Sequence, residues 1–533
     1  MVADLNWWRG GVIYQIYPRS FFDSNGDGIG DIPGVITHLD YIAELGVDAI
    51  WLSPFFTSPM KDFGYDISDY KDVDPMFGSL HDFKHLIEEA HQRGLKVIID
   101  QVYSHTSDQH LWFKESRESR DNPKADWYVW ADPKADGTAP NNWLSLFGGP
   151  AWKFDTRRGQ YFMHNFLSSQ PDLNFHNPEV QNAILDTARF WLELGVDGFR
   201  LDVVNMYFHD AALTDNGLAD SPEKQFVGAD KVNPFTRQYH IHQMCRDENL
   251  DFLKRLRAVM DEFPGTTTVG EIGAPGGMKY MAQYTSNGDK LHMAYTFELL
   301  EKEHSVDYIR KTIERVEQNL GDGWPCFALS NHDVERSASR WGKDAEDPKA
   351  YVRTTLGLLT TLRGSPCIYQ GEELGLPEAE VPFELLQDPF GIEFWPEFKG
   401  RDGCRTPIPW LNEAMGGFTS DGHPWLPIEP IHRQLAVAEQ KVDANSTLNF
   451  SRQLLAWRRQ HPALKDGRFE WLDSDPDLLL FRRVNDQESL VIALNMTSRE
   501  LPVEVTGSAV TVPGFQAATG GRIPAYTLAA WAE

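Results

Sequence analysis

Eight short hydrophobic runs recur along residues 11–373, and segments with apolar side chains at helical spacing separate them. The runs are almost continuously apolar, which is typical of parallel strands that helices cover on one face. They span residues 11–18, 47–54, 95–102, 196–202, 266–272, 292–297, 325–331 and 365–373. Eight such strand–helix units fit a closed barrel better than an open sheet. The pattern therefore predicts an α/β protein with a (β/α)8, or TIM-barrel, core.

Two segments depart from this alternation. Residues 103–171 follow the third strand and are rich in Trp, Asn, Pro and Gly, and they are too long for an ordinary loop. We expect them to form an inserted subdomain B. Residues 465–533 alternate in short strand-like runs separated by turns, which predicts a C-terminal antiparallel β-sandwich. The barrel domain is then assigned to residues 1–102 and 172–464.

Polar residues gather where the predicted strands end. They are Asp100, Arg200, Asp202, Glu271, Asn331, His332, Asp333 and Glu372. In a (β/α)8 barrel, side chains at the C-terminal ends of several strands converge on one cavity, which is the active face of the fold. The sequence therefore predicts an active site at this end of the barrel.

The composition and charge of the chain argue against several classes of partner. A net charge of −28 argues against nucleic acid, whose phosphates require clustered Lys and Arg. No apolar run approaches the roughly 20 residues of a membrane span, and no basic segment followed by an apolar one opens the chain. The four cysteines are far apart and form no CxxC pair. We expect reduced cysteines, a cytoplasmic location, no membrane or nucleic-acid partner, and a monomer or homodimer.

Seven motifs, in order along the chain, identify a resemblance. They are GVIYQIYPRSF (11–21), DQVYSHT (100–106), QPDLNF (170–175), GFRLDVVN (198–205), GEIG (270–273), LSNHD (329–333) and GEELG (371–375). Together they resemble glycoside hydrolase family 13, the α-amylase superfamily, and its branch of α-glucosidases and oligo-1,6-glucosidases. The resemblance covers nearly the whole chain. It implies a retaining, exo-acting enzyme that releases glucose from the non-reducing end of short α-glucosides.

The resemblance also implies three catalytic carboxylates. Asp202 matches the nucleophile, which forms a covalent glucosyl intermediate. Glu271 matches the general acid and base, and Asp333 matches the carboxylate that supports the transition state. Arg200 lies two residues before Asp202 on the same predicted strand, so both side chains point to one side and the guanidinium should orient the nucleophile. Neighbouring carboxylates should raise the pKa of Glu271.

Further positions match residues that bind the terminal sugar. His105 and His332 correspond to histidines that donate hydrogen bonds to its hydroxyls. Asp62 and Tyr65 correspond to ligands of the non-reducing end, and Arg401 corresponds to their basic partner. An Asp62–Arg401 ion pair would close the cavity behind the terminal glucose and make it a pocket. The candidate apolar walls of this pocket are Phe147, Phe166 and Phe297.

The sequence leaves the choice of glycosidic linkage open. Val203, the residue after the nucleophile, favours α-1,6 bonds by the criterion used in this branch, which makes an oligo-1,6-glucosidase (isomaltase) the alternative. Other segments resemble bacterial α-glucosidases that act on maltose-type substrates and transfer glucose to sugar or alcohol acceptors, with Glu378 a candidate contact for the leaving sugar. A sucrose- or trehalose-directed hydrolase or transferase is a further alternative. Water and an acceptor hydroxyl would attack the same intermediate.

The segment DSNGDGIGD alternates oxygen-bearing residues with glycines, as loops that wrap a hard cation do. Related oligo-1,6-glucosidases carry calcium at the matching loop. We expect a structural Ca²⁺, with Mg²⁺ possible and no organic cofactor. The candidate ligands are Asp23, Asn25, Asp27, Asp31 and the backbone carbonyl of Ile29.

Overall fold

Eight parallel strands form the centre of the molecule in the computed structural model, which describes residues 4–533. Residues 1–3 of the predicted barrel domain lie outside the described residues. The strands are β1 (Ile13–Ile16), β2 (Ala49–Leu52), β5 (Lys96–Gln101), β9 (Gly198–Leu201), β12 (Thr267–Ile272), β13 (Met293–Thr296), β14 (Cys326–Ala328) and β15 (Ser365–Tyr369). Their order is β13-β12-β9-β5-β2-β1-β15-β14, and a parallel bridge between Ala294 and Pro325 joins the two edge strands. The predicted barrel is confirmed.

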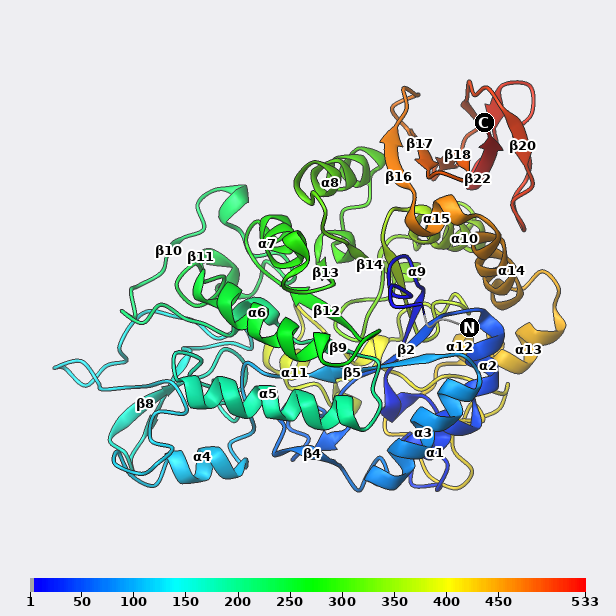
Figure 1. The fold of residues 1–533 in the computed structure, drawn as a ribbon. Helices are drawn as coiled ribbons and strands as arrows, with labels where there is room; N and C mark the ends of the chain where they lie inside the picture. The colour runs from blue at the N-terminus through cyan, green and yellow to red at the C-terminus, as the bar shows by residue number, and fades with distance from the viewer. Residues whose placement is uncertain (1–3) are drawn as a thin grey trace.

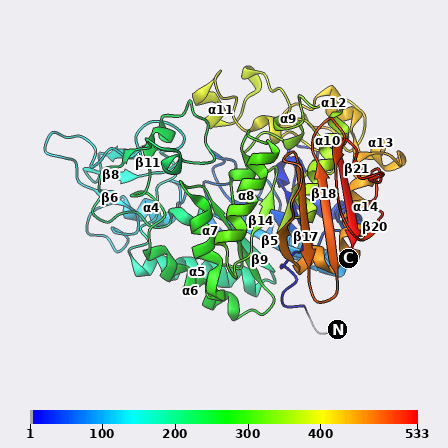
Figure 2. The ribbon, with the colours of Figure 1, turned by 90° about the horizontal axis from the view of Figure 1, so that it is seen from above.

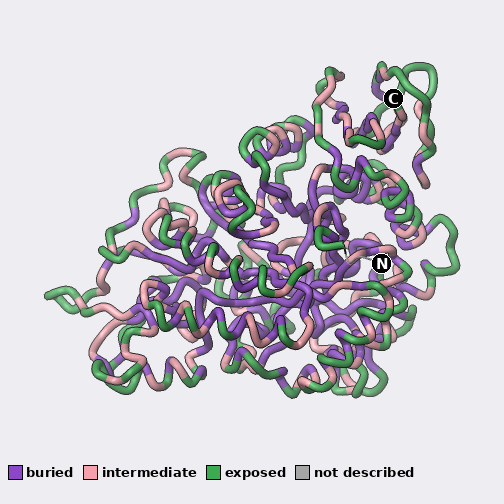
Figure 3. The backbone as a smooth tube through the Cα atoms, in the orientation of Figure 1, coloured by how far each residue is buried: buried purple, intermediate pink, exposed green. Residues whose placement is uncertain are grey.

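The strands are buried almost throughout, because the barrel interior and the surrounding helices cover both faces (Figure 3). Each strand is shorter than its predicted run, and two of them end three or four residues early. The predicted strand 325–331 ends at Ala328, and the predicted strand 365–373 ends at Tyr369. The polar residues that follow have left the sheet and lie on the loops at its C-terminal edge.

Helices surround the barrel in Figures 1 and 2. They are α1 (Ile32–Thr37), α2 (Leu39–Leu45), α3 (Leu80–Gln92), α5 (Pro178–Glu193), α6 (Glu248–Asp261), α7 (Gly277–Thr285), α8 (Val306–Asn319), α10 (Pro348–Thr361) and α14 (Thr447–Gln460). Their starts follow local capping chemistry. Ser79 and Asp82 form a capping box at α3, and the Asn177 side chain accepts the amide of Glu179 at α5.

Two excursions lie over the C-terminal face of the barrel. The first contains α4 (Leu111–Ser116) and a three-stranded antiparallel sheet of β6 (Trp130–Ala131), β8 (Gln160–Met163) and β7 (Trp152–Asp155). This is the inserted subdomain of the prediction. The second follows β9 and holds the short pair β10 (Gly217–Leu218) and β11 (Gln238–Tyr239). Its Asn233 and Gln243 side chains donate to the carbonyls of Leu146 and Leu144 in the first excursion.

The C-terminal region is antiparallel, as expected. A five-stranded sheet contains β16 (Arg468–Trp471), β17 (Leu478–Val484), β18 (Ser489–Asn495), β22 (Thr527–Ala532) and β20 (Ser508–Val510). A two-stranded sheet of β19 (Leu501–Pro502) and β21 (Arg522–Ile523) shares an apolar core with it. The larger sheet contacts α8 and α10, at the upper right of Figure 1.

Shorter elements complete the chain, including β3 (Phe56–Thr57), β4 (Asp69–Val73), α9 (Ser337–Arg340), α11 (Pro389–Phe394), α12 (Pro430–Gln434), α13 (Val437–Val442) and α15 (Pro462–Asp466). Within residues 4–533, none of the helices combines the length and apolar character needed to cross a membrane.

Candidate active site

Three neighbouring strands bring the first catalytic candidates together. Asp100 on β5 is in register with Arg200 on β9, and β9 pairs in turn with β12, which carries Glu271. Asp202 directly follows β9. Because side chains alternate along a strand, Arg200 and Asp202 point to the same side, as predicted.

Arg200 connects the carboxylates. Its Nη1 lies 2.7 Å from Asp202 Oδ1 and 2.8 Å from Asp100 Oδ1, and its Nη2 lies 2.6 Å from Glu271 Oε1. Asp202 and Glu271 therefore contact the two terminal nitrogens of one planar group. This arrangement is compatible with the separation of about 5–5.5 Å between the two carboxyls of a retaining glycosidase. The Arg200 side chain is fully buried, so water screens these interactions little.

Burial is the main influence on the protonation of both groups. It raises the pKa of Glu271 to about 7, against the opposing effect of Arg200, and the charges of Asp202 and Asp333 raise it further. The predicted direction is therefore present, but desolvation contributes more than like-charge repulsion. Burial likewise raises the pKa of Asp202 to about 7, and Arg200 opposes that shift. The charge of Asp202 therefore influences the protonation of Glu271, while Arg200 opposes the effect of burial on both carboxyls.

Asp333 has the opposite character. Burial favours its neutral form, but His332, Arg401 and Arg405 together hold the pKa of its carboxyl well below its usual range. Arg405 Nη2 lies 2.9 Å and Arg401 Nη1 3.2 Å from Asp333 Oδ1. Asp333 is thus a fixed anion beside a carboxyl, Glu271, that can hold a proton near neutral pH. This difference suits an acid and an electrostatic stabiliser in one cavity.

The predicted Asp62–Arg401 pair is present. Arg401 Nη2 lies 2.8 Å from Asp62 Oδ1, and both side chains are buried. Gln170, which lies in a motif but was not singled out, donates to Asp62 Oδ2 at 3.0 Å. His105 Nε2 lies 2.9 Å from the Tyr65 carbonyl, and burial lowers the pKa of its ring to about 4.

Several of these groups line one pocket, which has about 710 Å³ of empty space including the solvent at its mouth. Its lining includes the predicted Asp62, Tyr65, His105, Phe147, Phe166, Asp202, Val203, Glu271, Phe297, Asp333 and Arg401. Unpredicted lining residues are Leu146, Met206, Phe226, Gly228, Gly273 and Phe390. The unpredicted residues come mainly from loops, where neither strand nor helix periodicity marks a position as facing a cavity.

Three predicted substrate ligands lie outside the lining. Arg200 lies behind the carboxylates. His332 is fully buried behind Tyr65, with the two rings parallel and their centroids 5.2 Å apart. The Glu378 carboxyl accepts the backbone amide of Arg336 at 2.8 Å. Because its side chain is hydrogen-bonded to the loop after β14, the structure does not place Glu378 at a leaving sugar.

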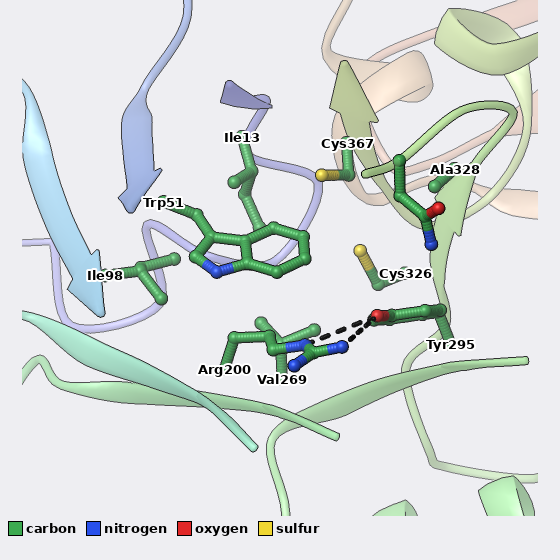
Figure 4. A pocket seen from close by; sticks show the side chains of 10 residues that line it. Ile13, Trp51, Ile98, Arg200, Val269, Tyr295, Cys326, Ala328 and Cys367 are labelled. Atoms are coloured by element: carbon green, nitrogen blue, oxygen red, sulfur yellow. Dashed lines mark hydrogen bonds between the residues drawn. The ribbon is translucent and has the colours of Figure 1, made fainter. Parts of the chain in front are cut away.

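Beneath Arg200 the barrel interior contains a separate apolar cavity (Figure 4). The guanidinium donates to the Tyr295 hydroxyl at 3.0 and 3.3 Å, and Tyr295 in turn donates to Glu271 at 3.1 Å. Arg200 therefore separates the charged pocket from the apolar core of the barrel. It is held from several sides and has little freedom to follow a moving substrate.

Val203 has an unusual backbone. Its φ of 35° lies in the left-handed region, which is rare and strained for a β-branched residue. In this conformation its amide donates to Glu271 Oε2 at 3.0 Å. Val203 therefore contributes a side chain to the pocket and a backbone contact to Glu271, the candidate acid.

The predicted cation loop is wound tightly between β1 and α1. Asp23 accepts the amides of Asn25, Gly26 and Gly28, while Asn25 accepts the amide of Asp27. Asp27 in turn accepts the amide of Ile29, and Asp31 accepts that of Gly34. Asp23 and Asp31 are buried, and no Lys or Arg in residues 4–533 forms an ion pair with either carboxylate. Over the same residues, His, Cys, Asp and Glu alone form no cluster of three suited to a metal.

Comparison with known proteins gives a consistent set of relatives. The family model for the α-amylase catalytic domain matches residues 15–467. A protein described as a probable alpha-glucosidase from Rhizobium meliloti (strain 1021) is 55% identical, over 94% of this chain and 92% of that protein. An oligo-1,6-glucosidase from Parageobacillus thermoglucosidasius is 37% identical, over 92% and 91%. The crystal structure of an α-glucosyl transfer enzyme is 55% identical, covers 99% of both chains and has a TM-score of 0.96.

Proposed function

Because this chain belongs to the α-amylase family, we propose that it is a retaining α-glucosidase that releases glucose from the non-reducing ends of short α-glucosides. The observation that carries this proposal is the Arg200 bridge, which places Asp202 and Glu271 side by side on one pocket. Relatives described as glucosidases at 55% and 37% identity support it.

The mechanism starts from ionised Asp202 and protonated Glu271, a state that is available near pH 7 because the pKa of each carboxyl lies at about 7. Asp202, ionised and oriented by Arg200, attacks the anomeric carbon, while protonated Glu271 gives its proton to the departing oxygen. This forms a glucosyl–Asp202 ester. Glu271, now ionised, takes a proton from water or from an acceptor hydroxyl, which attacks the ester and regenerates the enzyme. Asp333 stays anionic throughout and stabilises the positive charge that develops on the sugar ring.

Exo-action follows from the closed side of the pocket. Asp62 and Arg401 form a buried ion pair, and Gln170 donates a hydrogen bond to the second carboxylate oxygen of Asp62. Their remaining hydrogen-bonding capacity faces the cavity, where the hydroxyls of a terminal glucose would meet it. We infer that this pair closes the pocket behind the terminal glucose, so that one glucose is released at a time.

For the other side of the bond we propose maltose-type substrates with transfer of glucose to sugar or alcohol acceptors. The 55% identity to an α-glucosyl transfer enzyme supports transfer. An oligo-1,6-glucosidase remains the alternative, because Val203 occupies the position after the nucleophile and a relative of that description is 37% identical.

We further propose a structural Ca²⁺ in loop 23–31, with Mg²⁺ as the competing ion. Two buried carboxylates, Asp23 and Asp31, lie close enough that the charge of Asp23 adds to the burial that raises the pKa of Asp31. A divalent cation would relieve both effects. We also propose a monomer or homodimer with a cytoplasmic location, and four cysteines that are all unpaired support the location.

The test is to supply maltose, isomaltose, sucrose and trehalose in parallel and to follow glucose and new oligosaccharides over time. We expect glucose release and transfer products from maltose, with slower cleavage of isomaltose. Faster cleavage of isomaltose would support the alternative. Inertness toward all four sugars would contradict the α-glucosidase proposal.

A further inference from the structure

Asp388 is a buried carboxylate that does not line the pocket and belongs to none of the seven motifs. It is fully buried and caps the N-terminus of α11. Its Oδ2 accepts the backbone amide of Arg401 at 2.8 Å and Arg401 Nε at 3.1 Å, while its Oδ1 accepts Arg401 Nη2 at 2.8 Å. Such a fork of charge-assisted hydrogen bonds fixes both the position and the plane of a guanidinium.

The guanidinium that Asp388 fixes also contacts two carboxylates that line the pocket. Arg401 Nη2, already bound to Asp388, also lies 2.8 Å from Asp62, and Arg401 Nη1 lies 3.2 Å from Asp333. A flexible Arg with only these two partners could satisfy them in several rotamers. With Asp388 behind it, one arrangement satisfies all three carboxylates.

Charge supports the same assignment. Burial favours neutral Asp388, but the charge and hydrogen bonds of Arg401 dominate and lower the pKa of Asp388 below its usual value. Asp388 is therefore an anion behind the pocket. By contrast, burial raises the pKa of Asp62 despite the same arginine. The stronger electrostatic partner of Arg401 thus lies behind the pocket.

Asp388 also contacts Phe390, an apolar residue that lines the pocket. Asp388 Oδ1 accepts the amide of Phe390 at 3.2 Å, and the Phe390 ring stacks on Phe147 with centroids 4.8 Å apart. The backbone around it has no spare room. A Cβ at Gly400, which has φ +80°, would lie 2.8 Å from Asp388 Oδ2 and 2.6 Å from the Cα of Gly391.

We propose that Asp388 is a positioning residue that holds Arg401 against Asp62 and Asp333, so that the grip on the terminal sugar depends on it. The inference rests on the proposed glucosidase function and adds a residue that acts through Arg401, without touching the substrate.

The test is a double-mutant cycle of Asp388→Ala and Arg401→Ala, assayed on the α-glucoside that the wild type cleaves best. We expect Asp388→Ala to lower kcat/KM about 100-fold, mostly through KM, because Arg401 is misplaced and the bound sugar is held less tightly. In the Arg401→Ala background, the same change should cost less than about threefold. A loss in the double variant equal to the product of the two single losses would overturn the proposal, because Asp388 would then act independently of Arg401.

Two further variants separate positioning from folding. Asp388→Asn keeps the shape of the side chain and an acceptor for Phe390, and we expect it to fold and to lose about tenfold in kcat/KM. Asp155→Asn is the matched control, because Asp155 is also buried and paired with an arginine, Arg117, but lies in subdomain B away from the pocket. It should keep wild-type KM. Wild-type kinetics in Asp388→Asn would overturn the inference alone, whereas an inert wild type would overturn the proposed function as well.

Discussion

The pocket has two kinds of lining that differ in origin and in what holds them. The charged lining consists of Asp62, Asp202, Glu271, Asp333 and Arg401, and each of these side chains is tied to at least one opposite charge. The apolar lining consists of Leu146, Phe147, Phe166, Val203, Met206, Phe226, Phe297 and Phe390. Its members pack through aromatic contacts and complementary shape, as the edge-to-face Phe147 and Phe166 rings illustrate.

The difference lies in directionality. Ion pairs and hydrogen bonds fix angles as well as distances, so the charged lining can recognise one sugar in one orientation. Apolar contacts are non-directional and roughly proportional to area, so the apolar lining can accept several partners. We therefore expect changes in the charged lining to abolish catalysis, and changes in the apolar lining to redirect it.

The largest effect should follow Asp202→Asn. An amide cannot form the covalent glucosyl ester, so kcat should fall by more than about 100-fold on maltose and on aryl α-glucosides alike. Acid-quenched wild-type reactions should carry the added sugar on the peptide that contains Asp202, as detected by mass spectrometry. A variant that keeps more than about a hundredth of wild-type activity would show that the covalent mechanism is assigned wrongly.

The second-largest effect concerns the alkaline limb of the pH profile of kcat/KM, which we assign to Glu271. Burial raises its pKa to about 7, so the proton needed by the leaving group is present below that value and lost above it. We expect kcat/KM for maltose to fall as the pH rises through about 7. In Glu271→Gln this limb should disappear, with activity lost most on poor leaving groups and least on an activated aryl glucoside. Identical alkaline limbs in variant and wild type would assign the acid to another group.

How far the sequence predicted each lining reflects its origin. Asp202 directly follows β9, Glu271 lies near the end of β12 and Asp333 lies on the loop after β14. The predicted strands therefore place all three at one end of the barrel, and the structure confirms that barrel. Phe226 and Phe390 lie on irregular or very short elements, where no period marks an inward side chain. Asp388 shows only an Asp–Pro helix start, which indicates a cap and not a partner for Arg401.

Glu378 illustrates the limit of motif matching. Its place in the chain matched a substrate contact, yet its carboxyl accepts the Arg336 amide and does not border the pocket. The direction in which a loop side chain points depends on the packing of other loops, which neither composition nor periodicity encodes. The barrel places the charged groups, whereas the loops determine which side chains surround the rest of the substrate.

The apolar lining gives the third prediction. Phe297→Ala should lower kcat/KM for maltose about tenfold through KM. It should also shift products from transfer toward hydrolysis, because the lost aromatic area weakens binding of an acceptor sugar more than it weakens access of water. The measurement is the ratio of new oligosaccharide to free glucose at equal maltose consumption. Phe154→Ala is the control, since Phe154 is an exposed aromatic residue outside the pocket. An unchanged ratio would mean that Phe297 does not contact the acceptor.

A smaller shift should follow Val203→Thr. Both residues are β-branched, so the left-handed backbone and its amide contact with Glu271 are kept and only a methyl becomes a hydroxyl. Because one such group is worth about 1–3 kcal/mol, we expect the ratio of kcat/KM for maltose over isomaltose to rise about tenfold. Cleavage of an aryl α-glucoside, which lacks the second sugar, should change little. If that cleavage fell equally, Val203 would act on the catalytic groups and not on linkage.

The smallest effect concerns loop 23–31, which belongs to neither lining. A cation held by oxygens of Asp23, Asn25, Asp27, Ile29 and Asp31 would stabilise the fold by binding only the native loop, so chelation should lower Tm by about 1–3 °C and leave kcat/KM unchanged. Asp27→Asn should remove the dependence of Tm on added Ca²⁺, while Mg²⁺ in place of Ca²⁺ distinguishes the two ions. A Tm that is indifferent to both ions would mean that hydrogen bonds such as those from Gly26 and Gly28 to Asp23 suffice to hold the loop. A fall in kcat/KM without a change in Tm would instead place the cation's influence in the charged lining, and the separation between structural loop and pocket would fail.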